Sequence, residues 1–260
     1  MKRLLITNDD GIDAKGLRAA IDAFKDIFEI YVAAPMCQKS GYAHAATYFS
    51  RDNTAQRRSL PDVKEAWAVD GTPADCVFYA IHAFHMRPDF VLSGINHGSN
   101  LSLDTIYSGT VGAALEALIN GVPAAALSLV SETSHEFHTA AAYGKLLLGY
   151  YADHPALHDC ILNINVPDLP AGQIKGIRVA ELDEMRDYVK IVTSENTDRD
   201  TVSLHCESWV DAETIQNREG DAYLIEQGYV TVTPLGLNST VRKTLARLAD
   251  DFNKFGHIDV

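Results

Sequence analysis

The sequence has 260 residues, of which 47% are hydrophobic and 22% charged, so it can bury the core of an ordinary globular protein of one large domain or two small ones. Its formal net charge of −13 argues against extended DNA or RNA as a partner, because such binding depends on Lys and Arg that neutralise phosphates. No stretch approaches the roughly 20 apolar residues of a membrane span, so we expect no membrane partner. A small phosphate ester is not excluded, since one bound cation can invert the local field.

The cysteines point to a reducing compartment. Four of them lie far apart and form no C-x-x-C pair, at Cys37, Cys76, Cys160 and Cys206. The spacing of a zinc site is therefore absent. The first residues of the chain also lack the apolar core of a secretory signal. From these two observations we expect reduced thiols and a cytoplasmic protein.

The stretch 4–11 is the first informative one, since it begins as an apolar run and ends in Asp9, Asp10 and Gly11. An apolar run that stops at a glycine is typical of a buried strand. Apolar residues then recur at helical spacing, at Leu17, Ala20, Ile21 and Phe24. Strand, polar loop and helix form the opening unit of a parallel α/β sheet, in which ligands bind beyond the carboxyl ends of the strands.

The adjacent aspartates have two interpretations. Neighbouring side chains on a regular strand point to opposite faces, so Asp9 and Asp10 share one site only where the backbone turns, which Gly11 allows. Like charges held close need a compensating cation, and a hard divalent ion prefers oxygen ligands. The pair is therefore typical either of a metal site or of a polar strand end with ordinary Asp-Gly turn chemistry.

The next segments predict a second strand over 27–34, ended by Pro35. In the loop that follows, Lys39 offers a positive charge, Ser40 a hydroxyl and Gly41 close approach of the backbone, although a plain surface loop has the same composition. Residues 43–69 are less regular and carry a polar, basic patch. We expect them to form an excursion or hairpin away from the core.

A helix is expected to begin with Thr72 as N-cap and Pro73 in its first turn. A buried strand over 88–93 then leads into a loop with two glycines and two amide side chains. Within that loop, Asn96 is either a neutral oxygen ligand for a hard metal or an ordinary turn residue.

The stretch 107–119 is the second informative one. Ser108, Gly109 and Thr110 precede an apolar stripe of helical spacing. Such a start offers free N–H groups, hydroxyls and the positive end of a helix dipole, which suits a phosphate. Simple capping of a helix that binds nothing explains the same residues.

The rest of the chain predicts strands over 124–129, 160–167, 177–180 and 229–235, a helix over 138–151, and a terminal amphipathic helix marked by Val241, Leu245, Leu248 and Phe252. Between about 183 and 226 helical periodicity is lost and charges are many. We therefore expect an α/β fold with a Rossmann-like, mostly parallel sheet flanked by helices. Its parts are a catalytic core over 1–182, a β-rich arm or hairpin extension over 183–226, and a C-terminal strand and helix over 227–260.

Seven motifs occur together in this chain, in one order and at compatible spacing. They are 7–11 (TNDDG), 34–35 with 39–41 (AP and KSG), 71–75 (GTPAD), 93–96 (SGIN), 107–111 (YSGTV), 162–167 (LNINVP) and 226–235 (EQGYVTVTPL). This set closely resembles the SurE family of survival proteins, and the resemblance runs from residue 2 to about 240.

The resemblance implies a metal-dependent phosphatase, a 5′-nucleotidase that acts on nucleoside 5′- and 3′-monophosphates. It implies one divalent ion per subunit, Mg²⁺ or Mn²⁺, and a homodimer or homotetramer assembled through the C-terminal extension. The family's metal ligands correspond to Asp9, Asp10, Ser40 and Asn96. Its phosphate-contacting residues correspond to Asn8, Ser108, Gly109 and Thr110. Asp9 and Asp10 are the expected catalytic residues.

Roles within the expected site stay partly open. Asp9 is either a general base or a nucleophile, and the sequence does not separate the two. His97 is either a proton donor to the leaving oxygen or a plain loop histidine beside the site. The chain also departs from the family, which often has a basic cluster where this sequence has 181–186 (ELDEMR).

Two other functions are compatible with parts of the pattern. An aspartyl-phosphate phosphatase separates its two aspartates by one residue, whereas here they are adjacent, and it leaves Ser40 and Asn96 unexplained. A Rossmann-type module that binds nucleotides without catalysis lacks its G-x-G-x-x-G fingerprint here and gives the acid pair no purpose.

Overall fold

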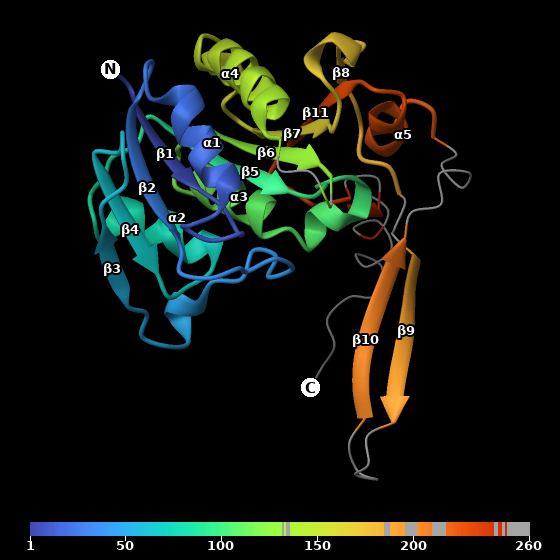
Figure 1. The fold of residues 1–260 in the computed structure, drawn as a ribbon, viewed down its shortest axis with the longest axis horizontal. Helices are drawn as coiled ribbons and strands as arrows, with labels where there is room; N and C mark the ends of the chain where they lie inside the picture. The colour runs from blue at the N-terminus through green and yellow to red at the C-terminus, as the bar shows by residue number, and fades with distance from the viewer. Residues whose placement is uncertain are drawn as a thin grey trace.

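A computed structural model of the chain describes residues 1–131, 133, 136–184, 188–195, 202–209, 217–241, 244, 245 and 248. Its centre is a nine-stranded sheet with the order β3-β4-β2-β1-β5-β6-β7-β11-β8 (Figure 1). Six strands of this sheet run parallel. In chain order they are β1 (Arg3–Thr7), β2 (Glu29–Pro35), β4 (Glu65–Val69), β5 (Phe90–His97), β6 (Ala124–Val130) and β7 (Ile161–Pro167).

Counted in chain order, the parallel strands lie across the sheet as 3-2-1-4-5-6, the order of a Rossmann fold. The order reverses between β1 and β5, which pair through Leu4–Phe90 to Thr7–Ser93. Chains that leave the carboxyl ends of these two strands diverge to opposite sides, so a crevice for ligands is expected at this point. The predicted fold class, a mostly parallel α/β sheet, is confirmed.

Three further strands complete the sheet at its edges. β3 (Ala55–Arg58) pairs antiparallel with β4, β11 (Val230–Leu235) pairs antiparallel with β7, and β8 (Ile177–Val179) pairs parallel with β11. The prediction that 43–69 lies away from the core is wrong for β4, which pairs with β2 inside the parallel set. The hydrophobic signal of β4 is weak because two of its buried residues are alanines, Ala66 and Ala68.

Helices cover both faces of the sheet (Figure 1). α1 (Lys15–Phe24) and α4 (His138–Ala152) pack on one face, while α2 (Pro73–His82) and α3 (Gly109–Ile119) pack on the other. Short 3-10 helices are η1 (Thr47–Phe49), η2 (Ser102–Ile106), η3 (Pro155–Leu157) and η4 (Ala171–Gln173). In the described part of the chain, no helix is both long and apolar enough to cross a membrane.

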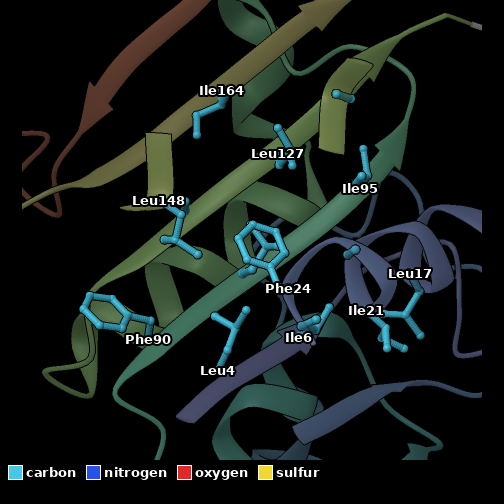
Figure 2. Packing of buried hydrophobic residues seen from close by; sticks show 14 of the residues in the cluster. Leu4, Ile6, Leu17, Ile21, Phe24, Phe90, Ile95, Leu127, Leu148 and Ile164 are labelled. Carbon is cyan, nitrogen blue, oxygen red and sulfur yellow. The ribbon is translucent and has the colours of Figure 1, made fainter. Parts of the chain in front are cut away.

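The larger core lies between the sheet and the α1–α4 layer. Figure 2 shows side chains of α1 lying against those of the central strands. Leu17, Ile21 and Phe24 are buried at the positions that helical spacing predicts. They pack against β1 at Leu4 and Ile6, both fully buried. This packing fixes β1, and with it the start of the loop that carries the acid pair.

The C-terminal part contains a separate two-stranded sheet. β9 (Tyr188–Glu195) and β10 (Val202–Trp209) pair antiparallel and project from the body of the molecule as a hairpin (Figure 1). The short α5 (Asp221–Glu226) follows and packs against β11. The hairpin falls in the segment 183–226, whose division from the core stays a prediction. Most of the predicted helix from Val241 to Phe252 lies outside the described residues.

Candidate active site

The turn after β1 is built by the side chain of Asn8. This side chain is fully buried, its amide donates to the carbonyl of Gly11 at 3.0 Å, and its carbonyl accepts from the N–H of Gly11 at 3.2 Å. Gly11 has a φ of +104°, a left-handed conformation that glycine adopts without strain. The turn that the sequence predicts is therefore present. Both polar groups of Asn8 serve it, and a contact of Asn8 with phosphate stays a prediction.

Asp9 is held against the start of α3. Its side chain is 3% exposed, and its Oδ1 accepts a hydrogen bond of 2.6 Å from the hydroxyl of Thr110. A Cβ placed on Gly109 would lie 2.9 Å from the Cβ of Asp9 and 3.0 Å from its Oδ2. Only glycine therefore allows this helix start to approach the carboxylate so closely.

The electrostatic setting of Asp9 disfavours a charged carboxylate in the free protein. Burial raises the pKa of Asp9 above its usual value, the hydrogen bond from Thr110 acts in the opposite direction, and the negative charge of Asp10 adds to the rise. Burial likewise raises the pKa of Asp10, which the N–H of His97 partly offsets. A cation placed between these side chains would stabilise both in their charged form.

Asp10 turns toward the end of β5 instead of toward α3. Its Oδ2 accepts from the N–H of His97 at 3.2 Å, and its side chain is half-buried. At the crevice, Asp9 therefore connects the end of β1 to α3, and Asp10 connects it to the end of β5. The ring of His97 meets Phe137 edge-on, with 6.3 Å between the ring centroids.

Asn96 presents one oxygen at the same end of β5. It is 7% exposed and follows a bulge in the β5–β6 pairing between Gly94 and Asn96. Its amide nitrogen donates to the carbonyl of Gly98 at 2.9 Å. The side-chain carbonyl oxygen is therefore the atom that Asn96 can offer to a cation.

The loop after β2 reaches the acid pair through its backbone. The N–H of Lys39 donates to the carbonyl of Asp9 at 2.6 Å, which places Ser40 one residue from this contact. Ser40 is exposed, and its hydroxyl accepts from the amide of Gln38 at 3.3 Å. Of the four predicted ligands, Ser40 is the most exposed to solvent.

The start of α3 combines capping with the approach to Asp9. The hydroxyl of Ser108 accepts from the N–H of Val111 at 3.0 Å, so Ser108 is the N-cap. Thr110 is fully buried, and its hydroxyl is used by Asp9. The positive end of the α3 dipole thus faces Asp9, and it also suits an anion bound there.

The residues fit a hard cation better than a soft one. Within the described ranges, no three His, Cys, Asp or Glu side chains gather as a metal site. Asp9, Asp10, Ser40 and Asn96 together offer two carboxylates, a hydroxyl and an amide carbonyl. An all-oxygen set of this kind is typical of Mg²⁺ or Mn²⁺.

Two buried carboxylates near the site were not predicted from the sequence. Asp75 is fully buried and accepts from the backbone N–H groups of Thr47 at 2.8 Å and Thr72 at 2.8 Å, so it fastens the loop after β2 to the start of α2. The capping-box spacing of Thr72 and Asp75 was a local signal that could have identified it. Asp221 is the second, and two of its partners, Ser102 and Asp183, are far away in the sequence.

Comparisons with known proteins identify the family. A family profile described as Survival protein SurE matches residues 4–188. The chain is 41% identical over 251 residues to the 5′-nucleotidase SurE of Aeromonas hydrophila, covering 95% of this chain and 96% of the relative. It is 37% identical over 258 residues to the 5′/3′-nucleotidase SurE of Proteus mirabilis, covering 98% and 97%.

A solved structure agrees with these sequence matches. The crystal structure of the SurE protein from Aquifex aeolicus superposes with a TM-score of 0.81 at 31% identity, covering 94% of this chain and 97% of that one. The likeness therefore extends over the fold as well as the sequence. The chain belongs to the SurE family.

Proposed function

We propose that this chain is a metal-dependent nucleotidase that releases phosphate from nucleoside 5′- and 3′-monophosphates. Membership of the SurE family and the names of its relatives support this function. The observation that carries it is the meeting of Asp9 and Asp10 with the start of α3 and the end of β5 at the β1–β5 crevice. A site for a phosphate ester can combine a cation with N–H donors. At this crevice the carboxylates can bind the cation, and the start of α3 supplies the N–H groups.

We propose Asp9, Asp10, Ser40 and Asn96 as the ligands of one Mg²⁺ or Mn²⁺ ion per subunit. When bound, such an ion polarises a phosphoryl oxygen and lowers the pKa of bound water. The carbonyl oxygen of Asn96 fits this role because Gly98 already takes its amide nitrogen. The raised pKa of both aspartates, which burial mainly causes, also fits, since a bound cation would stabilise their charged forms.

The remaining roles fall to residues that bind the phosphate or move a proton. Ser108, Gly109 and Thr110 direct the amino end of α3 at the non-bridging oxygens, with Asn8 supporting the turn beneath them. Oδ1 of Asp9 is held by Thr110, so Oδ2 is the better placed oxygen to take a proton from water or to attack phosphorus. These assignments make Asp9 and Asp10 the catalytic pair.

We also propose that the hairpin joins copies of the chain into a homodimer or homotetramer, with the core at 1–182, the extension at 183–226 and the C-terminal part at 227–260. An isolated two-stranded hairpin is marginally stable in water, which favours a partner for β9 and β10. Sedimentation at micromolar concentration should give a dimer or larger, and a monomer would contradict the proposal. A cytoplasmic location stays a prediction from the cysteine pattern.

The function is tested by phosphate release from a panel of nucleoside monophosphates, with Mg²⁺ and with Mn²⁺. We expect turnover with metal, none in excess EDTA, and recovery when metal is added back. Full activity in excess chelator would refute the proposed mechanism. Absence of turnover with retained nucleotide binding would indicate a binding module, and a phosphorylated aspartate trapped during turnover would make Asp9 a nucleophile.

A further inference from the structure

The two ends of the hairpin excursion meet at one place in the core, here called the hairpin neck and made of residues 181–183 and 220–222. Glu181 and Gly220 form a parallel bridge, and the N–H of Asp221 donates to the carbonyl of Glu181 at 3.0 Å. The chain leaves the neck toward β9 and returns to it after β10. Asp221 therefore lies where the chain leaves for the hairpin and where it returns.

The carboxylate of Asp221 is fully buried, and three backbone N–H groups and one hydroxyl donate hydrogen bonds to it. Its Oδ1 accepts from the N–H groups of Asp183 at 3.0 Å and Ala222 at 2.9 Å. Its Oδ2 accepts from the N–H of Ser102 at 2.9 Å, and the hydroxyl of Ser102 lies 3.4 Å from Oδ1. One oxygen thus belongs mainly to the hairpin neck and the other to the loop between β5 and α3.

From Ser102, a short series of hydrogen bonds runs to the start of α3. Ser102 opens η2 with a φ of +51°, and its carbonyl accepts from the hydroxyl of Thr105 at 2.8 Å. The carbonyl of Thr105 accepts in turn from the N–H of Ser108 at 3.4 Å. Ser108 is the N-cap of α3, so Asp221 is connected to the proposed phosphate-binding residues through two intervening residues.

The other end of this loop has a separate anchor. The N–H of Asn100 donates to Asn165 at 2.9 Å, and its amide donates to Ser128 at 2.7 Å. Asn96 itself pairs with Ser128 of β6, and Asn100 holds the loop to β6 and β7, so neither anchor depends on the contact between Asp221 and Ser102. Loss of the Asp221 contact should act on the start of α3 and spare the proposed metal ligand.

We propose that Asp221 is a positioning residue, which fastens the phosphate-binding start of α3 to the neck of the β9–β10 hairpin. This inference rests on the proposed function, because it assigns the start of α3 to phosphate. The position requires a carboxylate, since an amide has one acceptor oxygen for donors on two sides. The arrangement of the hairpin neck is thereby coupled to phosphate affinity.

The variant Asp221→Asn cuts one side of this connection. Its single oxygen is best used where two N–H groups meet, at Asp183 and Ala222, so its NH₂ group then faces the N–H of Ser102. Glu226→Gln is the matched control, because Glu226 is an exposed carboxylate on the same helix. For each protein we would measure kcat and KM for a nucleoside monophosphate, the Kd for Mn²⁺ and the melting temperature.

We expect Asp221→Asn to raise KM about tenfold, because the phosphate-binding start of α3 is then less well placed. The Kd for Mn²⁺ should stay at the wild-type value, and Glu226→Gln should match wild type throughout. A lower melting temperature with unchanged KM would overturn the proposal, because a merely structural residue gives that result. An equal rise in KM and in the Kd for Mn²⁺ would also overturn it. Wild-type protein without turnover would instead refute the proposed function.

A second measurement needs no variant. Hydrogen exchange of the Mn²⁺-loaded wild-type protein is followed with and without inorganic phosphate. Because coupling between two sites is reciprocal, phosphate should slow exchange in residues 102–108 and also in residues 220–222. Protection that stops at residue 108 would overturn the proposal, even if Asp221→Asn fails to fold.

Discussion

Asp9 and Ser40 follow neighbouring strands of the sheet, β1 and β2, yet they are held very differently. Asp9 is buried, bonded to Thr110 and pressed against Gly109. Ser40 is exposed, and its hydroxyl contacts only Gln38 among the described residues. Asp9 is therefore fixed by the protein itself, whereas Ser40, the proposed metal ligand on the other side, is held only loosely. Catalysis benefits from groups that are fixed before the substrate arrives.

This difference predicts the largest effect for Asp9→Asn. The variant keeps size and shape but removes the carboxylate that we propose to be catalytic, so kcat at saturating Mn²⁺ should fall by about 10²–10⁴-fold, as for a lost general base. A kcat within about tenfold of wild type would show that Asp9 is a replaceable ligand.

The same variant should not weaken the metal-free fold. The folded-state pKa of Asp9 is raised above the unfolded value, so its ionised form costs stability at neutral pH. This cost shrinks as pH falls through the folded pKa and is gone below the unfolded pKa. Metal-free Asp9→Asn should therefore melt at or above the wild-type temperature at pH 7. The difference should shrink in acid. A clearly lower melting temperature at pH 7 would contradict this account.

Gly109→Ala tests the close contact between α3 and Asp9. The new methyl group would lie 2.9 Å from the Cβ of Asp9 and 3.2 Å from Pro73, so either the carboxylate or the helix start must shift. Overpacking of this kind costs about 1–3 kcal/mol of stability. Misplacement of a reacting group by about 1 Å can lower the rate about 10²-fold. We expect both effects, read from thermal melts and kcat.

Gly149→Ala is the control for this substitution. Gly149 lies in α4, and a Cβ there meets nothing within 4 Å. Alanine in a helix is favoured over glycine by about 0.5–1 kcal/mol, so this variant should melt slightly higher and keep full activity. Equal activity of the two alanine variants would mean that Gly109 does not shape the site.

The sequence predicted those parts of the site that local patterns encode. The strand, turn and helix over 3–24 follow from apolar spacing and Gly11, and the structure confirms them. The hydroxyl of Thr110 reaches Asp9 across 101 positions in sequence, and Asp221 reaches Ser102 across 119. Contacts this distant leave no periodic signal. Both therefore had to come from the structure.

Thr110→Val tests whether the hydrogen bond from Thr110 to Asp9, and not only the packing of residue 110, is needed for activity. Valine has nearly the size of threonine but lacks the hydroxyl, so Oδ1 of Asp9 stays buried without its 2.6 Å hydrogen bond. An unsatisfied buried acceptor costs about 1–3 kcal/mol, and we expect kcat to fall about tenfold. Thr110→Ser keeps the hydroxyl and should retain most of the activity. Equal losses in both variants would point to packing as the cause.

Ser40→Ala should give the smallest effect, and only in the presence of metal. Its side chain is exposed, so the melting temperature of the metal-free protein should equal that of wild type. Mg²⁺ and Mn²⁺ sites commonly keep several waters, and one water can replace a neutral hydroxyl, so the Kd for Mn²⁺ should rise by less than about tenfold. At saturating Mn²⁺, kcat should then return close to wild type. If kcat stays low under that condition, Ser40 is as firmly set as Asp9 once metal is bound, and the contrast between the two sides holds only for the free protein.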